Sequence, residues 1–120
     1  MPSGGTMQIQ INTDRNIEGH EALETRVRGE VERALNRFRA QVTRVEVHLS
    51  DENSHKSGEN DKRCVIEARL EDQRPIAVTH QAATLDQAID GAASKLSRLI
   101  ESTLGRLYDP KARRAERPPV

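Results

Sequence analysis

The segment TLDQAIDGAASKLSRLI, residues 84–100, carries the most regular helical pattern in this chain. Its apolar residues recur at steps of three and four, so they share one side of a helix. These residues are Leu85, Ala88, Ile89, Ala92, Leu96, Leu99 and Ile100. Thr84 and Gln87 have the spacing of a capping box, in which each side chain bonds to a backbone N–H at the helix start. The segment therefore predicts an amphipathic helix with one face packed against the rest of the fold.

Strand and helix patterns precede this segment in a definite order. Residues 7–12 alternate apolar and polar side chains, which is typical of a strand buried on one face. From about residue 21 to residue 39 the apolar spacing becomes helical, and Gly29 in the middle of this helix predicts a close approach to another element. Three more alternating segments follow, at residues 44–49, 63–70 and 76–79. The order of elements is therefore β-α-β-β-β-α.

This order predicts an α+β fold with a four-stranded mixed sheet. The first two strands are parallel through a right-handed crossover, and the later strands form antiparallel hairpins. Each helix has one apolar stripe, so we expect both helices to pack on one face of the sheet. The other face then displays polar and charged residues, namely Gln8, Gln10, Arg44, Glu46, Arg63, Glu67 and Arg69. We expect arginine and glutamate to lie opposite each other on neighbouring strands of this face and to stabilise their pairing.

A chain of 120 residues is long enough for one domain with one core. We expect this domain at residues 7–108, between a flexible extension at residues 1–6 and a disordered basic tail at residues 109–120. Cys64 is the single cysteine, which excludes an internal disulfide and predicts a buried structural thiol. No apolar run has the length of a membrane span or the form of a signal peptide, so we expect a cytoplasmic protein.

Charged residues make up 32% of the chain, yet the formal net charge is zero. A nucleic-acid partner would therefore have to be bound by a local basic patch. His48, Asp51, Glu52 and His55 lie close together in the sequence, but their spacing matches no metal-ligand pattern. No group of residues has the arrangement of nucleophile, acid and base that catalysis requires. The sequence predicts a protein that is not an enzyme and has no metal, cofactor or small-molecule substrate.

Short motifs along the chain carry a family resemblance. They are Met7-Gln8-Ile9-Gln10-Ile11, Glu21-Ala22-Leu23 and Ala88-Ile89-Asp90-Gly91, followed by Lys95, Leu96 and Arg98. With the order of elements, they resemble the ribosome hibernation-promoting factors, a family that includes the ribosome-associated inhibitor and the sigma-54 modulation proteins. The resemblance extends from about residue 7 to residue 107 and is to the short members. It implies the fold given above and binding to 16S rRNA in the mRNA and tRNA path of the small ribosomal subunit, where such factors silence idle ribosomes.

Carried over by position, the resemblance implies that four helix cations contact rRNA phosphates: Arg33, Lys95, Arg98 and Arg106. Tail cations are expected either to add to this surface or only to aid solubility, and they include Lys111, Arg113 and Arg114. Residues 101–104 replace the lysine-rich run of short members, and Glu24 and Glu30 stand where basic residues are usual. A second function therefore stays open. In it, the same fold has lost ribosome binding and binds a protein through its charged sheet face or through the acidic loop expected at residues 51–61.

Overall fold

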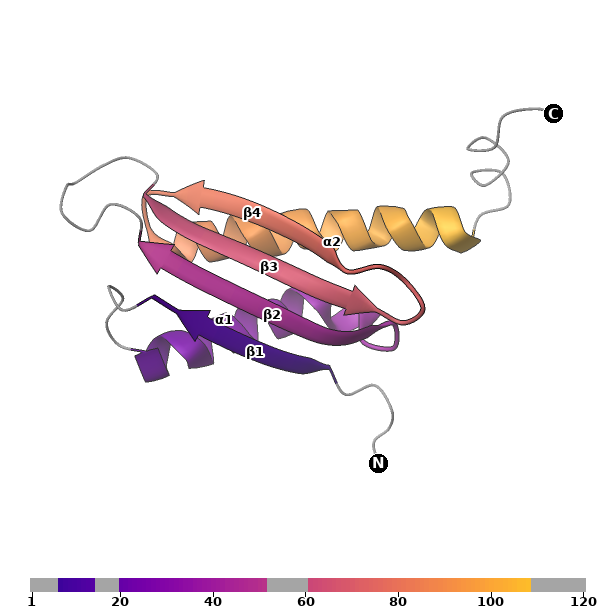
Figure 1. Ribbon diagram of the computed structural model, residues 1–120, viewed down its shortest axis with the longest axis horizontal. Coiled ribbons are helices and arrows are strands. Elements are labelled where there is room, and N and C mark those ends of the chain that lie inside the picture. The colour runs from indigo at the N-terminus through magenta and orange to yellow at the C-terminus, as the bar shows by residue number, and fades with distance from the viewer. Residues whose placement is uncertain (1–6, 15–19, 52–60, 109–120) are drawn as a thin grey trace.

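The computed structural model of the protein describes residues 7–14, 20–51 and 61–108. Its elements are β1 (Gln8–Thr13), α1 (His20–Leu35), the 3₁₀ helix η1 (Asn36–Phe38), β2 (Val42–Asp51), β3 (Lys62–Leu70), β4 (Ile76–Ala82) and α2 (Leu85–Tyr108). The strands form one sheet, and α1 and α2 lie on the same face of it (Figure 1). The predicted α+β fold is confirmed. The expected extension at residues 1–6 and tail at residues 109–120 lie outside the described residues.

The sheet has the strand order β1-β2-β3-β4 and is mixed, as predicted. β1 pairs with β2 in parallel, whereas β2 with β3 and β3 with β4 are antiparallel. Since α1 follows β1 and α2 follows β4, both helices run back along the sheet and are parallel to each other (Figure 1). β1 and β4 form the two edges, so each has one side without a neighbouring strand.

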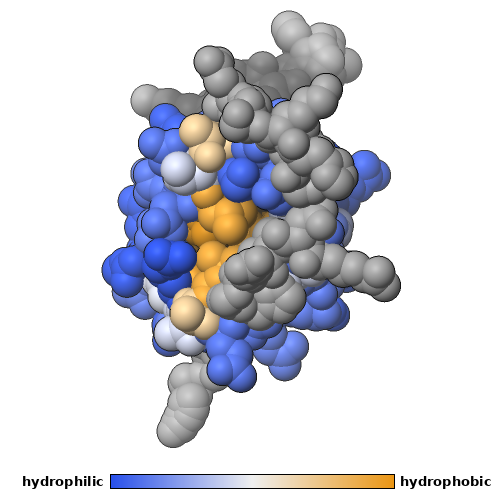
Figure 2. All heavy atoms as spheres, turned by 90° about the vertical axis from the view of Figure 1, so that its left-hand side faces the viewer, coloured by the Kyte–Doolittle hydropathy of each residue, from blue (hydrophilic) through white to orange (hydrophobic). Residues whose placement is uncertain are grey.

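The core lies between the sheet and the helices and is almost entirely aliphatic. Seen from the end where α2 begins, hydrophobic residues form a central band with hydrophilic residues beside it (Figure 2). The alternation predicted for the second and third strands is confirmed, because their inward side chains are buried: Val45, Val47, Leu49, Cys64, Ile66, Ala68 and Leu70. Burial raises the pKa of the Cys64 thiol to about 12, so this thiol stays protonated at neutral pH, as a structural thiol should.

Both helices differ from prediction in detail. The first helix was expected to continue to Arg39, but α1 ends at Leu35 and the tighter η1 turn brings Phe38 into the core. Leu99 was expected on the buried side of α2 but is 37% exposed, since it lies one turn after Lys95 on the flank that faces the edge strand β4. At the start of α2, the backbone N–H of Gln87 donates to Thr84 Oγ1 at 3.1 Å, which is the threonine half of the predicted box. Within the described ranges, no helix is long and apolar enough to cross a membrane.

The close approach predicted at Gly29 occurs instead at Gly91. A Cβ on Gly29 would meet only the Arg33 guanidinium, at 3.6 Å, which is an ordinary contact. A Cβ on Gly91 would overlap the imidazole ring of His80 on β4. Glycine at position 91 therefore lets α2 lie directly on the edge strand of the sheet.

The charged face of the sheet exists as predicted, but its cross-strand pairing was predicted wrongly. Arg44 lies opposite Arg69, and Glu46 lies opposite Glu67, so like charges face each other. Arg44 instead pairs along its own strand with Glu46 at 2.8 Å and donates to Gln10 Oε1 at 2.8 Å. The register follows from the buried residues on the opposite face, and the exposed charges take the places that this register leaves them.

Candidate nucleic-acid interface

The outer surface of the two helices brings together the cations predicted to contact RNA. Arg33 extends from α1, and the other three extend from α2: Lys95, Arg98 and Arg106. All four side chains are exposed. The tail cations predicted to join them lie outside the described residues, namely Lys111, Arg113 and Arg114.

Arg98 is the predicted cation most available to a ligand. It is exposed on α2, and within the described parts of the chain its side chain has no hydrogen bond or ion pair. A guanidinium group in this state can bind a phosphate with two parallel N–H donors without first leaving another partner. Arg106 is exposed in the last turn of the same helix, where the helix dipole favours a cation.

Lys95 is partly engaged by the sheet. Its Nζ donates a hydrogen bond of 2.9 Å to the carbonyl oxygen of Thr79 on the edge strand β4. The opposite edge has a similar contact, because Arg28 Nη1 donates to the carbonyl oxygen of Ile9 on β1 at 3.0 Å. Charged side chains that cover the edge of a sheet hinder its pairing with another chain. Lys95 thus occupies one carbonyl oxygen of the edge strand β4 while keeping its positive charge on the same helix as Arg98.

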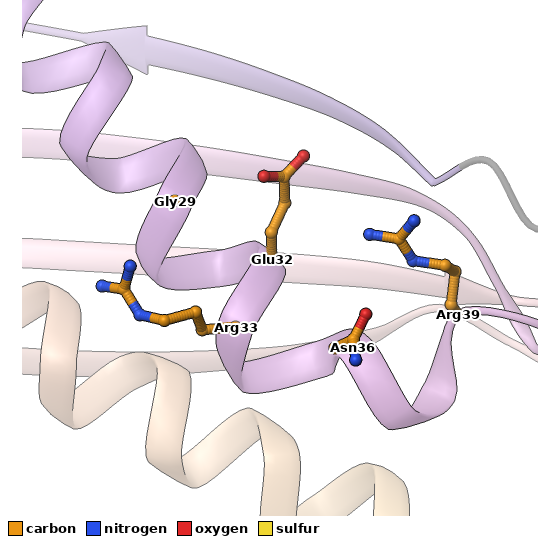
Figure 3. Close-up of a pocket in the computed structure, with 5 residues that line it drawn as sticks. All are labelled: Gly29, Glu32, Arg33, Asn36 and Arg39. Carbon is orange, nitrogen blue, oxygen red and sulfur yellow. The ribbon is translucent and has the colours of Figure 1, made fainter.

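Arg33 is partly neutralised on its own helix. Its Nη2 lies 2.9 Å from Glu30 Oε1, and its side chain is 73% exposed. Arg33 also lines a shallow hollow on the outer face of α1, together with Gly29, Glu32, Asn36 and Arg39. In Figure 3 the Arg39 guanidinium extends from the far end of this hollow toward Glu32, while Arg33 lies on the side nearer α2. The hollow therefore has an arginine on each side of exposed helix backbone.

Arg39 is a candidate contact that the sequence did not single out. It is exposed, and its side chain has no hydrogen bond or ion pair within the described residues. Sequence patterns showed it only as a cation near the end of the first helix. Its place beside the hollow depends on the η1 turn, which the regular helical spacing did not reveal.

Among the described residues, two ion pairs join α2 to the preceding helical segments, one from α1 and one from η1. Arg26 lies 3.3 Å from Asp86, and Arg37 lies 3.2 Å from Glu101. Arg37 also contacts Ser97 Oγ at 3.5 Å and stacks 4.7 Å from the centre of the Phe38 ring. Glu101 therefore joins the helices and neutralises Arg37. Sequence reasoning missed this role because the partners are 64 residues apart.

The titratable groups outside this surface do not form a metal centre in the described ranges. No group of three histidine, cysteine, aspartate or glutamate residues lies together there. Asp51 lies 3.4 Å from Lys62 Nζ, and His48 lies 3.5 Å from Glu46. The hydrogen bond that Lys62 Nζ donates to Asp61 Oδ1, helped by Asp51, raises the pKa of Lys62. Glu52 and His55, the other residues of that cluster, lie outside the described residues.

The described residues form an α+β domain with cations exposed on its helix layer. The family model described as "Sigma 54 modulation protein / S30EA ribosomal protein" matches residues 9–108, and the chain belongs to this family of ribosome-associated factors. The resemblance seen in the sequence is confirmed.

Solved structures support the same fold. The N-terminal domain of Protein Y from Thermus thermophilus is similar, with a TM-score of 0.65, 24% identity, and coverage of 81% of this chain and 99% of that one. A ribosomal subunit interface protein from Coxiella burnetii has a TM-score of 0.61 and 14% identity, covering 83% of this chain and 99% of that one. No curated protein sequence matches the chain.

Proposed function

We propose that the protein binds the small ribosomal subunit through 16S rRNA phosphates and silences or protects idle ribosomes in the cytoplasm, without catalysis. Membership of a family of ribosome-associated factors supports the ribosome as partner. The observation that carries the RNA contact is the exposed guanidinium of Arg98, which has no partner among the described residues, with Lys95 and Arg33 exposed on the same helix layer. Arg106 and the tail cations Lys111, Arg113 and Arg114 are proposed to add to this surface.

The ion pairs on the helices set the expected strength of this binding. Arg26, Arg33 and Arg37 are each paired with a carboxylate, so the surface has fewer unpaired cations than its arginine content suggests. Binding to RNA phosphates releases condensed cations, and log K falls with log salt by about 0.7–0.9 for each phosphate neutralised. We therefore expect binding that is measurable at low salt and is lost at moderate salt.

Co-sedimentation with purified small subunits tests the proposal. The full chain should pellet with the subunits at about 50 mM salt and much less at about 300 mM salt. Arg98→Glu should weaken binding about tenfold and reduce the salt slope, because it removes one phosphate contact and adds a repulsive charge. Arg74→Glu is the matched control, since Arg74 is another exposed arginine without a partner in the described residues but lies in the β3–β4 turn. Equal losses for the two variants would refute a helix-face contact.

The second candidate is a protein-interaction module that has lost ribosome binding. The Arg37–Glu101 pair favours it, because a carboxylate occupies a surface that RNA binding would keep positive. On this alternative, the small subunits pellet and the protein stays in the supernatant, even at low salt. That single result separates the two functions.

A further inference from the structure

The open face of the sheet has two rows of like charge. Figure 1 views the molecule from this side, with α1 and α2 behind the strands. Arg44 and Arg69 lie side by side on β2 and β3 and form the arginine row. Glu46 lies two residues after Arg44 on β2, and Glu67 lies two residues before Arg69 on β3. These two glutamates lie side by side and form the glutamate row. The rows are about 6.6 Å apart, since two residues of a strand span that distance.

This arrangement is unfavourable for the isolated sheet. Like charges directly opposite each other destabilise strand pairing. On β2 the cost is reduced, because Arg44 pairs with Glu46 at 2.8 Å. On β3, the side chains of Glu67 and Arg69 have no hydrogen bond or ion pair with any described residue. These two side-chain charges are therefore not neutralised within the described part of the chain.

We propose that the open sheet face binds the open sheet face of a second copy of this chain. The two copies are related by a two-fold axis that lies in the interface, perpendicular to the strands and between the two rows. This axis places each row over the row of opposite charge on the other copy. Arg69 then faces the partner's Glu67, and Glu67 faces the partner's Arg69. The same operation places Arg44 over the partner's Glu46. A surface that is complementary to itself is what a two-fold interface requires.

The size of the face sets the expected strength. The axis passes over Val45 and Ala68, near one end of the sheet, so the two copies overlap over about 23 Å on β2 and over less on the other strands, and about 250 Å² of each copy is buried. The total of about 500 Å² is below the range of stable interfaces, so the dimer is transient and depends on salt. The helix layer remains exposed on the outside of both copies. The inference therefore does not rest on the proposed ribosome contact.

Charge reversal on β3 gives a direct test. Sedimentation velocity should show the full chain forming dimers between about 10 µM and 1 mM at low salt and dissociating at high salt. Glu67→Arg and Arg69→Glu should each weaken the dimer by about tenfold or more. Each substitution gives positions 67 and 69 the same charge, so β3 of one copy repels β3 of the other. A mixture of these two variants should form a heterodimer. The double variant Glu67→Arg/Arg69→Glu exchanges the rows and should dimerise as the parent chain does.

Other outcomes overturn the proposal. A parent chain that is monomeric at about 1 mM and low salt has no such interface. A dimer that survives both single reversals uses another surface, and so does a dimer that Arg98→Glu on the helix face disrupts. A mixture of the two β3 variants that stays monomeric excludes a second copy as the occupant of this face. Circular dichroism of each variant shows that it remains folded.

Discussion

The helix layer and the open sheet face bear the same kinds of charged residue but pair them in opposite ways. Across the helix seam, Arg26 meets Asp86 and Arg37 meets Glu101, so unlike charges neutralise each other. Across β2 and β3, arginine faces arginine and glutamate faces glutamate. The helix seam pairs its charges within the chain, whereas on the sheet face the side chains of Glu67 and Arg69 have no partner among the described residues.

This difference shows that charge composition does not determine charge pattern. The chain has zero formal net charge, yet its register sorts like charges into rows on one surface. Two helices packed side by side can adjust the long side chains at their seam until opposite charges meet. Strands cannot make this adjustment, because a shift of one residue would turn every buried side chain outward.

The contact between α2 and the edge strand β4 gives the largest expected change in the free energy of unfolding. Gly91→Ala adds a methyl group where the His80 ring lies, so α2 must move away from β4 or the ring must rotate. We expect a loss of about 1–3 kcal/mol in the free energy of unfolding, measured by urea denaturation. Both surfaces should then lose their regular geometry together.

A double-mutant cycle distinguishes this clash from a general loss of helix stability. His80→Ala in the Gly91→Ala background should restore most of the lost stability, because the methyl group then has room. Gly29→Ala is the matched control on α1 and should be neutral or stabilising, since an added Cβ there makes only an ordinary contact. If the two effects at positions 80 and 91 simply add, the close contact does not determine the packing of α2.

Cys64 lies in the core between the two layers and provides a pH-dependent prediction of intermediate size. Burial raises its pKa from 9.0 to about 12, so between these values the unfolded chain releases the proton while the folded chain keeps it. Stability is therefore fully present below pH 9 and falls as the pH rises toward 12. From pH 8 to pH 10 this thiol should cost about 1.4 kcal/mol.

Comparison with Cys64→Ala isolates this contribution from other groups that titrate at high pH. The variant should lose less stability than the parent chain between pH 8 and pH 10, when urea denaturation is measured at both values. Alkylation of the parent thiol by iodoacetamide should require unfolding, because the thiol is buried and protonated. Equal pH slopes for the two chains would contradict the assigned pKa.

The sequence predicted the fold in most respects because each element has a strong apolar period. The alternation around Val45 and Ile66 and the helical spacing from Leu85 to Ile100 determine which side of each element is buried. The end of α1 was missed because the η1 turn keeps Phe38 buried, as a continued helix also would. Leu99 was placed on the wrong side because periodicity cannot tell where a sheet ends beside a helix.

The candidate site was less predictable because its properties depend on pairs from distant segments. Arg98 could be identified from its place on the helix and its exposure is found as expected. The Lys95 contact with Thr79 and the Arg37 contact with Glu101 arise only when α2 packs against β4 and α1. Spacing within one helix does not reveal such contacts. The cross-strand partners of Arg44 and Glu46 were missed for the same reason, since the register of two strands was required.

Release of Arg37 from its ion pair is expected to have a smaller effect, on binding rather than folding. Glu101→Gln removes the carboxylate 3.2 Å from Arg37 and leaves that cation free to bind phosphate. We expect the affinity for small subunits to rise about threefold to tenfold at low salt and the salt slope to steepen. Asp90→Asn is the matched control, because it removes an exposed α2 carboxylate that has no partner in the described residues. An equal gain for both variants would mean that general charge, not release of Arg37, controls the affinity.

The smallest effects test the comparison of the two surfaces most directly. Glu67→Gln removes one of two like charges that face each other, so the monomer should gain about 0.2–0.5 kcal/mol of stability. Glu101→Gln breaks an exposed pair of unlike charges, so it should lose about 0.2–1 kcal/mol. Urea denaturation at low micromolar protein, where the proposed dimer is absent, measures both changes. High salt should reduce the gain and the loss together, because both are interactions between exposed charges. If both substitutions shift stability in the same direction, the two surfaces do not differ in the way that their geometry indicates.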